Sequence, residues 1–137
     1  MEFIKIGVSA SSDIPDAAIA LCSKKIDAVL QVMDNLTDVS FGKISEVCQK
    51  HKVPLFGFSS SNVEDGAILA LSRDFFTGGL EAGIIAAEII NGKNPNDIAF
   101  KPVLKSYLAV NPETAKFYGI KIPDKIMKKA IKIIVKN

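Results

Sequence analysis

The chain has 137 residues, of which 48% are hydrophobic and 23% charged, and its formal net charge is +2. This length and balance are typical of one globular domain and exclude a disordered chain. The small net charge and the absence of tryptophan argue against nucleic acid as a partner. No apolar run is long enough to cross a membrane, and the first eight residues resemble a strand more than a targeting signal.

Strand and helix patterns alternate from the N-terminus. Residues 3–8 predict a first strand, and Pro15 lies near the first turn of a helix whose apolar positions recur at helical spacing. Residues 27–32 predict a second strand, followed by a helix capped by Thr37 or Asp38. The expected inner face of that helix consists of Val39, Ile44, Val47 and Cys48.

The middle of the chain continues the same pattern. Residues 53–58 predict a third strand, and residues 62–66 predict a single helical turn closed by Gly66. Residues 67–71 predict a fourth strand, after which Asp74 caps a long helix that runs to Ile90. The many small residues of this helix permit close packing against a neighbour.

The C-terminal third predicts one more strand and two helices. Residues 103–110 form the expected fifth strand, residues 111–119 a short helix, and residues 123–136 an amphipathic helix. We expect the last helix to dock on the domain with a solvated basic face, although such helices can also lie on membranes. The lysines of that face are Lys125, Lys128, Lys129, Lys132 and Lys136.

This order of elements predicts an α/β fold of three layers, with a mostly parallel sheet and helices on both faces. Cys22 and Cys48 fall in helical patterns, so we expect two buried thiols. A disulfide or metal site is not expected, because no Cys-x-x-Cys spacing occurs and His51 is the only histidine. We expect His51 to lie on the surface at a helix end.

The sequence lacks the usual motifs of enzyme chemistry. It has no Gly-x-Gly-x-x-Gly or Walker sequence, and His51 lies away from any strand-end loop where a serine hydrolase would need its base. A phospho-receiver domain would carry an acidic pair after its first strand, where this chain has Ser9, Ala10 and Ser11. We therefore predict no catalytic residue, no metal site and no cofactor.

Polar side chains follow several of the predicted strands. They are Ser9 to Ser12, then Asp34, Asn35 and Thr37, then Ser59 to Asn62, and finally Asp74. Ligands of open α/β sheets bind beyond the carboxyl ends of strands, so these residues are candidate ligand contacts. The same residue types are ordinary helix caps, and both interpretations remain open. An aspartate beside amide and hydroxyl groups suits a ligand with an ammonium and a carboxylate group.

Several segments together resemble one family. They are SASSDIPDAAIA (9–20), DAVLQVMDNLT (27–37), VPLFGFSSSNVEDG (53–66), RDFFTGGLEAGIIAA (73–87), NPNDI (94–98) and residues 111–119. In this order they resemble the C-terminal part of the ABC-transporter substrate-binding proteins, the family that includes tryptophan- and tyrosine-type receptors. The resemblance implies the type I periplasmic-binding fold, in which two lobes joined by a hinge hold the ligand in a cleft.

The resemblance also implies which residues bind the ligand. They are Asp34, Asn35, Thr37, Ser59, Ser60 and Asp74. Three departures from the family pattern concern the ligand. Leu36 interrupts the usual Asp-Asn-Thr run, Phe75 and Phe76 stand where tyrosines are frequent, and Ser60 stands near a position that is often acidic.

By this resemblance, residues 1–137 correspond to one truncated lobe, without the strand and helix that normally precede residue 1. The helix at 74–92 would pack on the absent N-terminal lobe, and its exposed apolar surface would favour homo-oligomers. The resemblance implies a non-enzymatic receptor of an ABC importer for an amino acid or similar small polar solute. Its partner would be a membrane permease, and its location periplasmic or lipoprotein-anchored.

Two other classes of function remain open from the sequence. One is a small flavodoxin-like α/β enzyme or nucleotide-binding domain, and the other is an interaction module that acts through its exposed surface. A cytoplasmic protein and a chain whose natural start is missing both fit the absence of a targeting signal.

Overall fold

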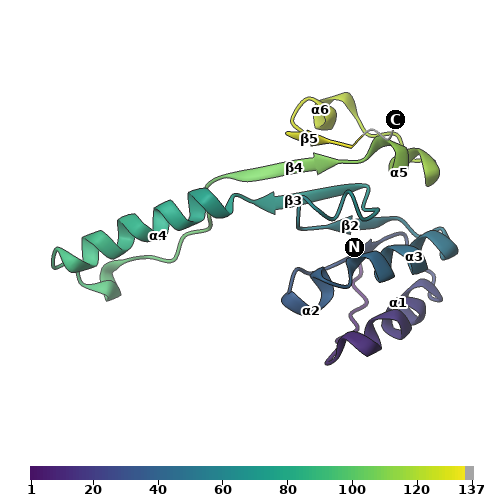
Figure 1. Ribbon diagram of the computed structural model, residues 1–137, viewed down its shortest axis with the longest axis horizontal. Helices are drawn as coiled ribbons and strands as arrows, with labels where there is room; N and C mark the ends of the chain where they lie inside the picture. Colours follow the sequence, from purple (N-terminus) through teal and green to yellow (C-terminus); the bar gives the residue numbers. More distant parts are fainter. Residues whose placement is uncertain (135–137) are drawn as a thin grey trace.

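The computed structural model describes residues 1–134, and its centre is a five-stranded sheet (Figure 1). The strands are β1 (Val29–Leu30), β2 (Leu55–Gly57), β3 (Leu69–Arg73), β4 (Ser106–Val110) and β5 (Lys132–Ile133), in that spatial order. Every neighbouring pair is parallel except β3 and β4, which are antiparallel. The predicted α/β fold with a mostly parallel sheet is confirmed.

The core lies between one face of the sheet and two long helices. The helices α1 (Ile14–Cys22) and α3 (Phe41–His51) pack on each other beside the sheet. In β3, Ala70 and Ser72 are buried while Leu71 and Arg73 are exposed, as the period of two requires. Buried apolar side chains from α1, α3, β1, β2, β3 and β4 form one cluster.

The predictions for the two cysteines and for His51 are confirmed. The Sγ atoms of Cys22 in α1 and Cys48 in α3 lie 3.8 Å apart, and both thiols are free and buried. Burial raises the pKa of both thiols. His51 is exposed in the last turn of α3.

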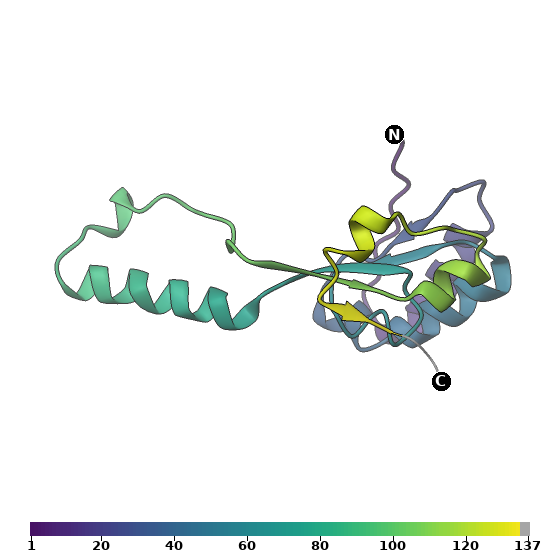
Figure 2. The ribbon, with the colours of Figure 1, turned by 90° about the horizontal axis from the view of Figure 1, so that it is seen from above.

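A long arm projects from this body. It consists of α4 (Phe75–Ile90), the 3₁₀ turn η2 (Pro95–Asp97) and the segment that returns to β4, so we define the arm as residues 75–105. Figures 1 and 2 show the arm reaching away from the sheet on one side. None of the 16 residues of α4 is buried, although most of them are apolar. No helix among the described residues is long and apolar enough to span a membrane.

The first predicted strand does not form. Residues 3–8 have no assigned secondary structure, and residues 1–7 are exposed. A strand is stabilised by hydrogen bonds to a neighbouring strand, and this segment makes none with the five described strands. Within this segment Val8 packs against the core cluster, and the apolar side chains of residues 3–6 remain exposed.

Two helix predictions were also wrong in their bounds. The helix expected after Thr37 is split into α2 (Asn35–Asp38) and α3, and Val39 between them is 82% exposed instead of buried. The long helix expected at 123–136 is reduced to α6 (Asp124–Met127). The amide of Ile131 donates to the Leu108 carbonyl and that of Ile134 to the Val110 carbonyl, so strand pairing replaces the helix. Lys136 lies outside the described residues.

The other predicted elements are present: β1, β2, β4 and α5 are shorter than predicted, β3 lies two residues later, and α4 has the predicted bounds. Gly66 closes the predicted turn with a positive φ of 107°, a conformation that glycine adopts without strain. The helix α5 (Pro112–Phe117) follows β4 and is capped by Asn111, whose side chain accepts from the amide of Thr114.

Candidate functional site

The predicted site residues lie at one end of the sheet. Because β1, β2 and β3 are mutually parallel, their carboxyl ends meet at the same edge. The loops that begin at Asp34, Ser59 and Asp74 follow these three strands in turn. Figure 1 shows α2 and the base of α4 at this edge, on the side from which the arm leaves the body.

Asp34 caps α2. Its Oδ1 atom accepts hydrogen bonds from the amides of Leu36 and Thr37 at 2.7 and 2.9 Å, and Thr37 Oγ1 lies 2.9 Å from Oδ2. The hydrogen bonds from Thr37 hold the pKa of Asp34 below its ordinary value, so the carboxylate is charged at neutral pH. A carboxylate has about four acceptor positions. Three are used, and the exposed side chain keeps one towards solvent.

Gln31 supports this loop from inside the sheet, and sequence reasoning missed it. Its side chain is 4% exposed, and Nε2 donates to Thr37 Oγ1 at 2.9 Å. The Oε1 atom is buried and has no hydrogen-bond partner among the described residues. The signal in the sequence was a polar residue at an inward-facing position of an apolar strand. Asn35, which was predicted to bind the ligand, is exposed beside this network.

Asn62, which the sequence offered only as one of the polar residues after a strand, joins the loop after β2 to α2. It is 1% exposed, its Oδ1 accepts from the amide of Ser59 at 2.8 Å, and its Nδ2 donates to Asp38 Oδ1 at 3.1 Å. The hydroxyl groups of Ser59 and Ser61 are 2.7 Å apart. The predicted contacts Ser59 and Ser60 are half-buried, and the structure brings their loop next to α2.

Asp74 repeats the cap of Asp34 in a different environment. Both begin an Asp-x-x-Thr sequence, and Asp74 accepts from the amides of Phe76 and Thr77 and from the Thr77 hydroxyl. Tyr107 adds a fourth hydrogen bond to Oδ2 at 2.6 Å, and Lys105 Nζ lies 3.4 Å from the same atom.

These contacts fill the acceptor positions of Asp74. The hydrogen bonds, chiefly those from the side chains of Thr77 and Tyr107, lower the pKa of Asp74. The residue is 5% exposed. The ligand contact predicted for Asp74 stays a prediction.

A small apolar pocket lies beside the three loops. It has a volume of about 250 Å³ and is lined by Val32, Met33, Phe58, Leu71 and Arg73. Met33, Phe58 and Arg73 each directly precede one of the predicted contacts Asp34, Ser59 and Asp74. The pocket thus places apolar surface next to the polar loop ends.

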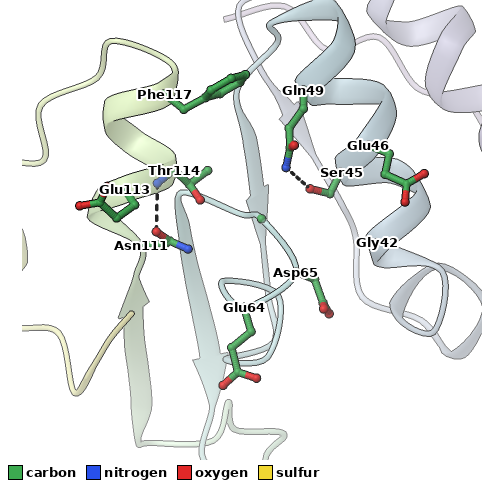
Figure 3. A pocket seen from close by; sticks show the side chains of 11 residues that line it. Gly42, Ser45, Glu46, Gln49, Glu64, Asp65, Asn111, Glu113, Thr114 and Phe117 are labelled. Atoms are coloured by element: carbon green, nitrogen blue, oxygen red, sulfur yellow. Dashed lines mark hydrogen bonds between the residues drawn. The ribbon is translucent and has the colours of Figure 1, made fainter. Parts of the chain in front are cut away.

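A second pocket of about 400 Å³ lies between α3, the loop at 64–66 and α5 (Figure 3). Its lining includes the carboxylates of Glu46, Glu64, Asp65 and Glu113. Asn111 belongs to this lining and follows the carboxyl end of β4, which is antiparallel to β3. The acidic pocket therefore lies at the opposite end of the sheet from the predicted site. Within residues 1–134, no group of three or more His, Cys, Asp or Glu residues could hold a metal ion.

Residues 1–134 match the model of the family described as ABC transporter substrate binding protein. The chain belongs to this family. The family consists of solute-binding proteins, and its members are typically extracytoplasmic. The chain is 30% identical over 115 residues to a tyrosine-binding protein of Clostridioides difficile, a match that covers 84% of this chain and 33% of that protein.

Solved structures show the same fold. A conserved domain protein from Vibrio cholerae has a TM-score of 0.76 and 28% identity, over 91% of this chain and 42% of that one. An ABC domain from Streptococcus pneumoniae in complex with L-Trp has a TM-score of 0.74 and 24% identity, over 93% and 44%. A ligand-free, open substrate-binding protein with adhesive properties from Clostridium difficile has a TM-score of 0.65 and 23% identity, over 98% and 44%. The chain thus spans less than half the length of these family relatives.

Proposed function

We propose that this chain provides one side of the solute-binding cleft of an ABC importer receptor, and that the solute is an amino acid or a similar small polar molecule. The observation that carries the proposal is the meeting of three polar loops at the carboxyl ends of β1, β2 and β3. Membership of the family supports a solute-binding role. The tyrosine-binding protein and the L-Trp complex among the relatives support an amino acid as the solute.

In this proposal a carboxylate binds the ammonium group of the solute, and hydrogen-bond donors bind its carboxylate. Asp34 has one acceptor position towards solvent, and we assign it to the solute ammonium group. The side-chain amide of Asn35 and the hydroxyl groups of Ser59 and Ser60 supply donors for the carboxylate. The Thr37 hydroxyl has a single proton, which it donates within its own loop, so Thr37 shapes the site through Asp34. The apolar pocket beside the loops offers surface to a hydrophobic side chain.

In this proposal the arm connects the chain to the first lobe, which forms the other side of the cleft. We propose that α4 packs on a first lobe, because a helix with this much exposed apolar surface is otherwise unstable in water. The exposed apolar side chains of the arm include Phe75, Phe76, Leu80, Ile84, Ile90, Phe100 and Leu104. A solute bound between two lobes would favour the closed state, and that state would deliver the solute to the membrane permease.

A titration followed by NMR tests the proposal on this chain. With only one side of the cleft present, we expect weak binding of L-tryptophan or L-tyrosine, in the millimolar range. The amide signals of residues 34–37 and 59–60 should shift, and Asp34→Asn should remove the shifts. Shifts confined to the acidic pocket, or no shifts up to the solubility limit of L-tryptophan, would refute the assignment of this site.

A further inference from the structure

The carboxylate of Asp74 joins the two places where the chain passes between body and arm. The chain leaves the body at Arg73 and Asp74 and returns at Lys105 and Ser106. Asp74 belongs to the outgoing segment, and its Oδ2 accepts a hydrogen bond from Tyr107 of the returning one. The amide of Asp74 donates to the Lys105 carbonyl at 3.0 Å.

Other contacts at the base of the arm join the same two segments. Arg73 Nη1 donates to Ser106 Oγ at 2.8 Å, and Arg73 pairs with Ser106 in the β3–β4 register. Further out, a Cβ atom on Gly78 would lie 3.2 Å from Val103, so α4 and the returning segment already touch there. The amide of Leu104 also donates to Glu81 Oε1 at 3.4 Å. Because α4 has no buried residue, its direction depends on these few contacts with the returning segment.

Comparison of the two Asp-x-x-Thr caps separates their roles. Asp34 and Asp74 make the same three bonds to their own helices. Asp74 alone is buried and alone has two partners on another segment, Tyr107 and Lys105. With about four acceptor positions, its carboxylate has none left for a solute ammonium group.

We propose that Asp74, through Tyr107 and Lys105, latches the base of the arm, and that it is a positioning residue of the solute site and not a solute contact. This inference rests on the proposed function, because the arm is the element that we assign to the first lobe. The latch fixes the direction in which the arm meets that lobe. It thereby fixes how the second side of the cleft faces Asp34.

Two labels measure the direction of the arm without any solute. Ala87→Cys places one spin label on α4 and Lys50→Cys places the other on α3; both positions are exposed. Cys22 and Cys48 are 7% and 0% exposed, so they should remain unlabelled in the folded chain. Double electron–electron resonance then gives the distribution of distances between the label on the arm and the label on the body.

Four variants separate the latch from the cap and from general effects of substitution. Asp74→Asn keeps the Oδ1 acceptor of the cap and loses the Oδ2 acceptor, while Tyr107→Phe removes only the hydroxyl donor. The matched controls are Asp34→Asn, which alters the same kind of cap where the carboxylate has no partner like Tyr107 on a second segment, and Tyr118→Phe. The Tyr118 hydroxyl is buried without a hydrogen-bond partner among the described residues.

We expect Asp74→Asn and Tyr107→Phe to broaden the distance distribution, and the two controls to keep its wild-type width. In the NMR titration, Asp74→Asn should retain the shifts at residues 34–37 and 59–60 that Asp34→Asn removes. An unchanged width in both latch variants would overturn the latch. Loss of the solute shifts in Asp74→Asn, with the wild-type width kept, would make Asp74 a solute contact.

The measurements separate this inference from the proposed function. If the wild-type chain gives no solute shifts at all, the proposed solute site fails. The distance distributions of Asp74→Asn and Tyr107→Phe still decide whether the latch exists.

Discussion

Replacing Asn62 by alanine should separate the two loops that carry most of the proposed solute site. The side chain is 1% exposed and makes two hydrogen bonds, one from the amide of Ser59 and one to the carboxylate of Asp38. Each bond contributes about 0.5–1.5 kcal/mol, and because the Ser59 amide that loses its acceptor is only half-buried, we add about 1 kcal/mol, the low end of the penalty for an unpaired donor. We therefore expect Asn62→Ala to lower the free energy of unfolding by about 2–4 kcal/mol.

The size of the thermal shift follows from the length of the chain. An unfolding entropy of about 2.1 cal/mol/K per residue gives about 0.3 kcal/mol/K for a chain of 137 residues. The melting temperature of Asn62→Ala should thus fall by about 7–14 °C. Below that temperature, the NMR shifts that L-tryptophan induces at residues 34–37 and 59–60 should be lost or strongly reduced.

Asn111→Ala is the matched control. Asn111 is 4% exposed and also makes two hydrogen bonds, to the Val63 carbonyl at 2.8 Å and from the Thr114 amide at 3.0 Å, at the other end of the sheet. Its removal should cost similar stability and leave the solute shifts intact. Gly57→Ala provides a second route, because the added Cβ would lie 2.5 Å from Asn62 Oδ1 and displace that side chain. Intact solute shifts in Asn62→Ala, or equal losses in Asn111→Ala, would refute the reasoning.

Three further predictions concern the arm, the thiols and Asp74. We expect the wild-type chain to self-associate through α4 in sedimentation velocity, and glutamate at both Leu80 and Ile84, which are exposed, to abolish this association without changing the melting temperature. A monomeric wild type, or a variant that still associates, would contradict this contact. Burial raises the pKa of both thiols, so Cys22 and Cys48 should resist a disulfide reagent at about pH 8.5 in the folded chain. Both should react fully in urea. Rapid reaction without urea would show that the contact between α1 and α3 opens readily. Hydrogen bonds lower the pKa of Asp74, so its stabilisation is complete above about pH 4 and disappears as the pH falls towards the pKa of the folded state. In urea unfolding, Asp74→Asn should therefore be less stable than the wild type at neutral pH, and the difference should shrink below about pH 3; a difference independent of pH would contradict this linkage.

Local sequence signals identified most elements but not all of their bounds. Where the backbone conformation depends only on neighbouring residues, the predictions are confirmed: a helix starts at Pro15, Asp74 caps α4, and Gly66 closes a turn. The split between α2 and α3 was missed, because the cap lies at Asp34 and not at Thr37 or Asp38. The pattern at 131–134 fits a helix and a strand alike, and pairing with β4 decides for the strand.

In the candidate site too, the sequence predicted the positions of residues along the chain but not their contacts in space. The sequence placed Asp34, Ser59 and Asp74 after strands, and parallel pairing brings those strand ends to one edge. It could not show that Gln31 and Asn62 hold these loops, since both contacts depend on side chains that face inward. Nor could it separate Asp34 from Asp74, which begin the same Asp-x-x-Thr sequence.

The sequence by itself determined most of the order of strands and helices from residue 14 to residue 117, the buried thiols and the family, because periodicity, caps and motifs are properties of neighbouring residues. Only the tertiary structure shows which of the two carboxylates, Asp34 or Asp74, has an acceptor position free for a ligand. Tyr107 lies 33 residues from Asp74 along the chain and fills its last position, while Asp34 keeps one towards solvent. Hydrogen-bond capacity is set by neighbours in space, and only folding brings them together.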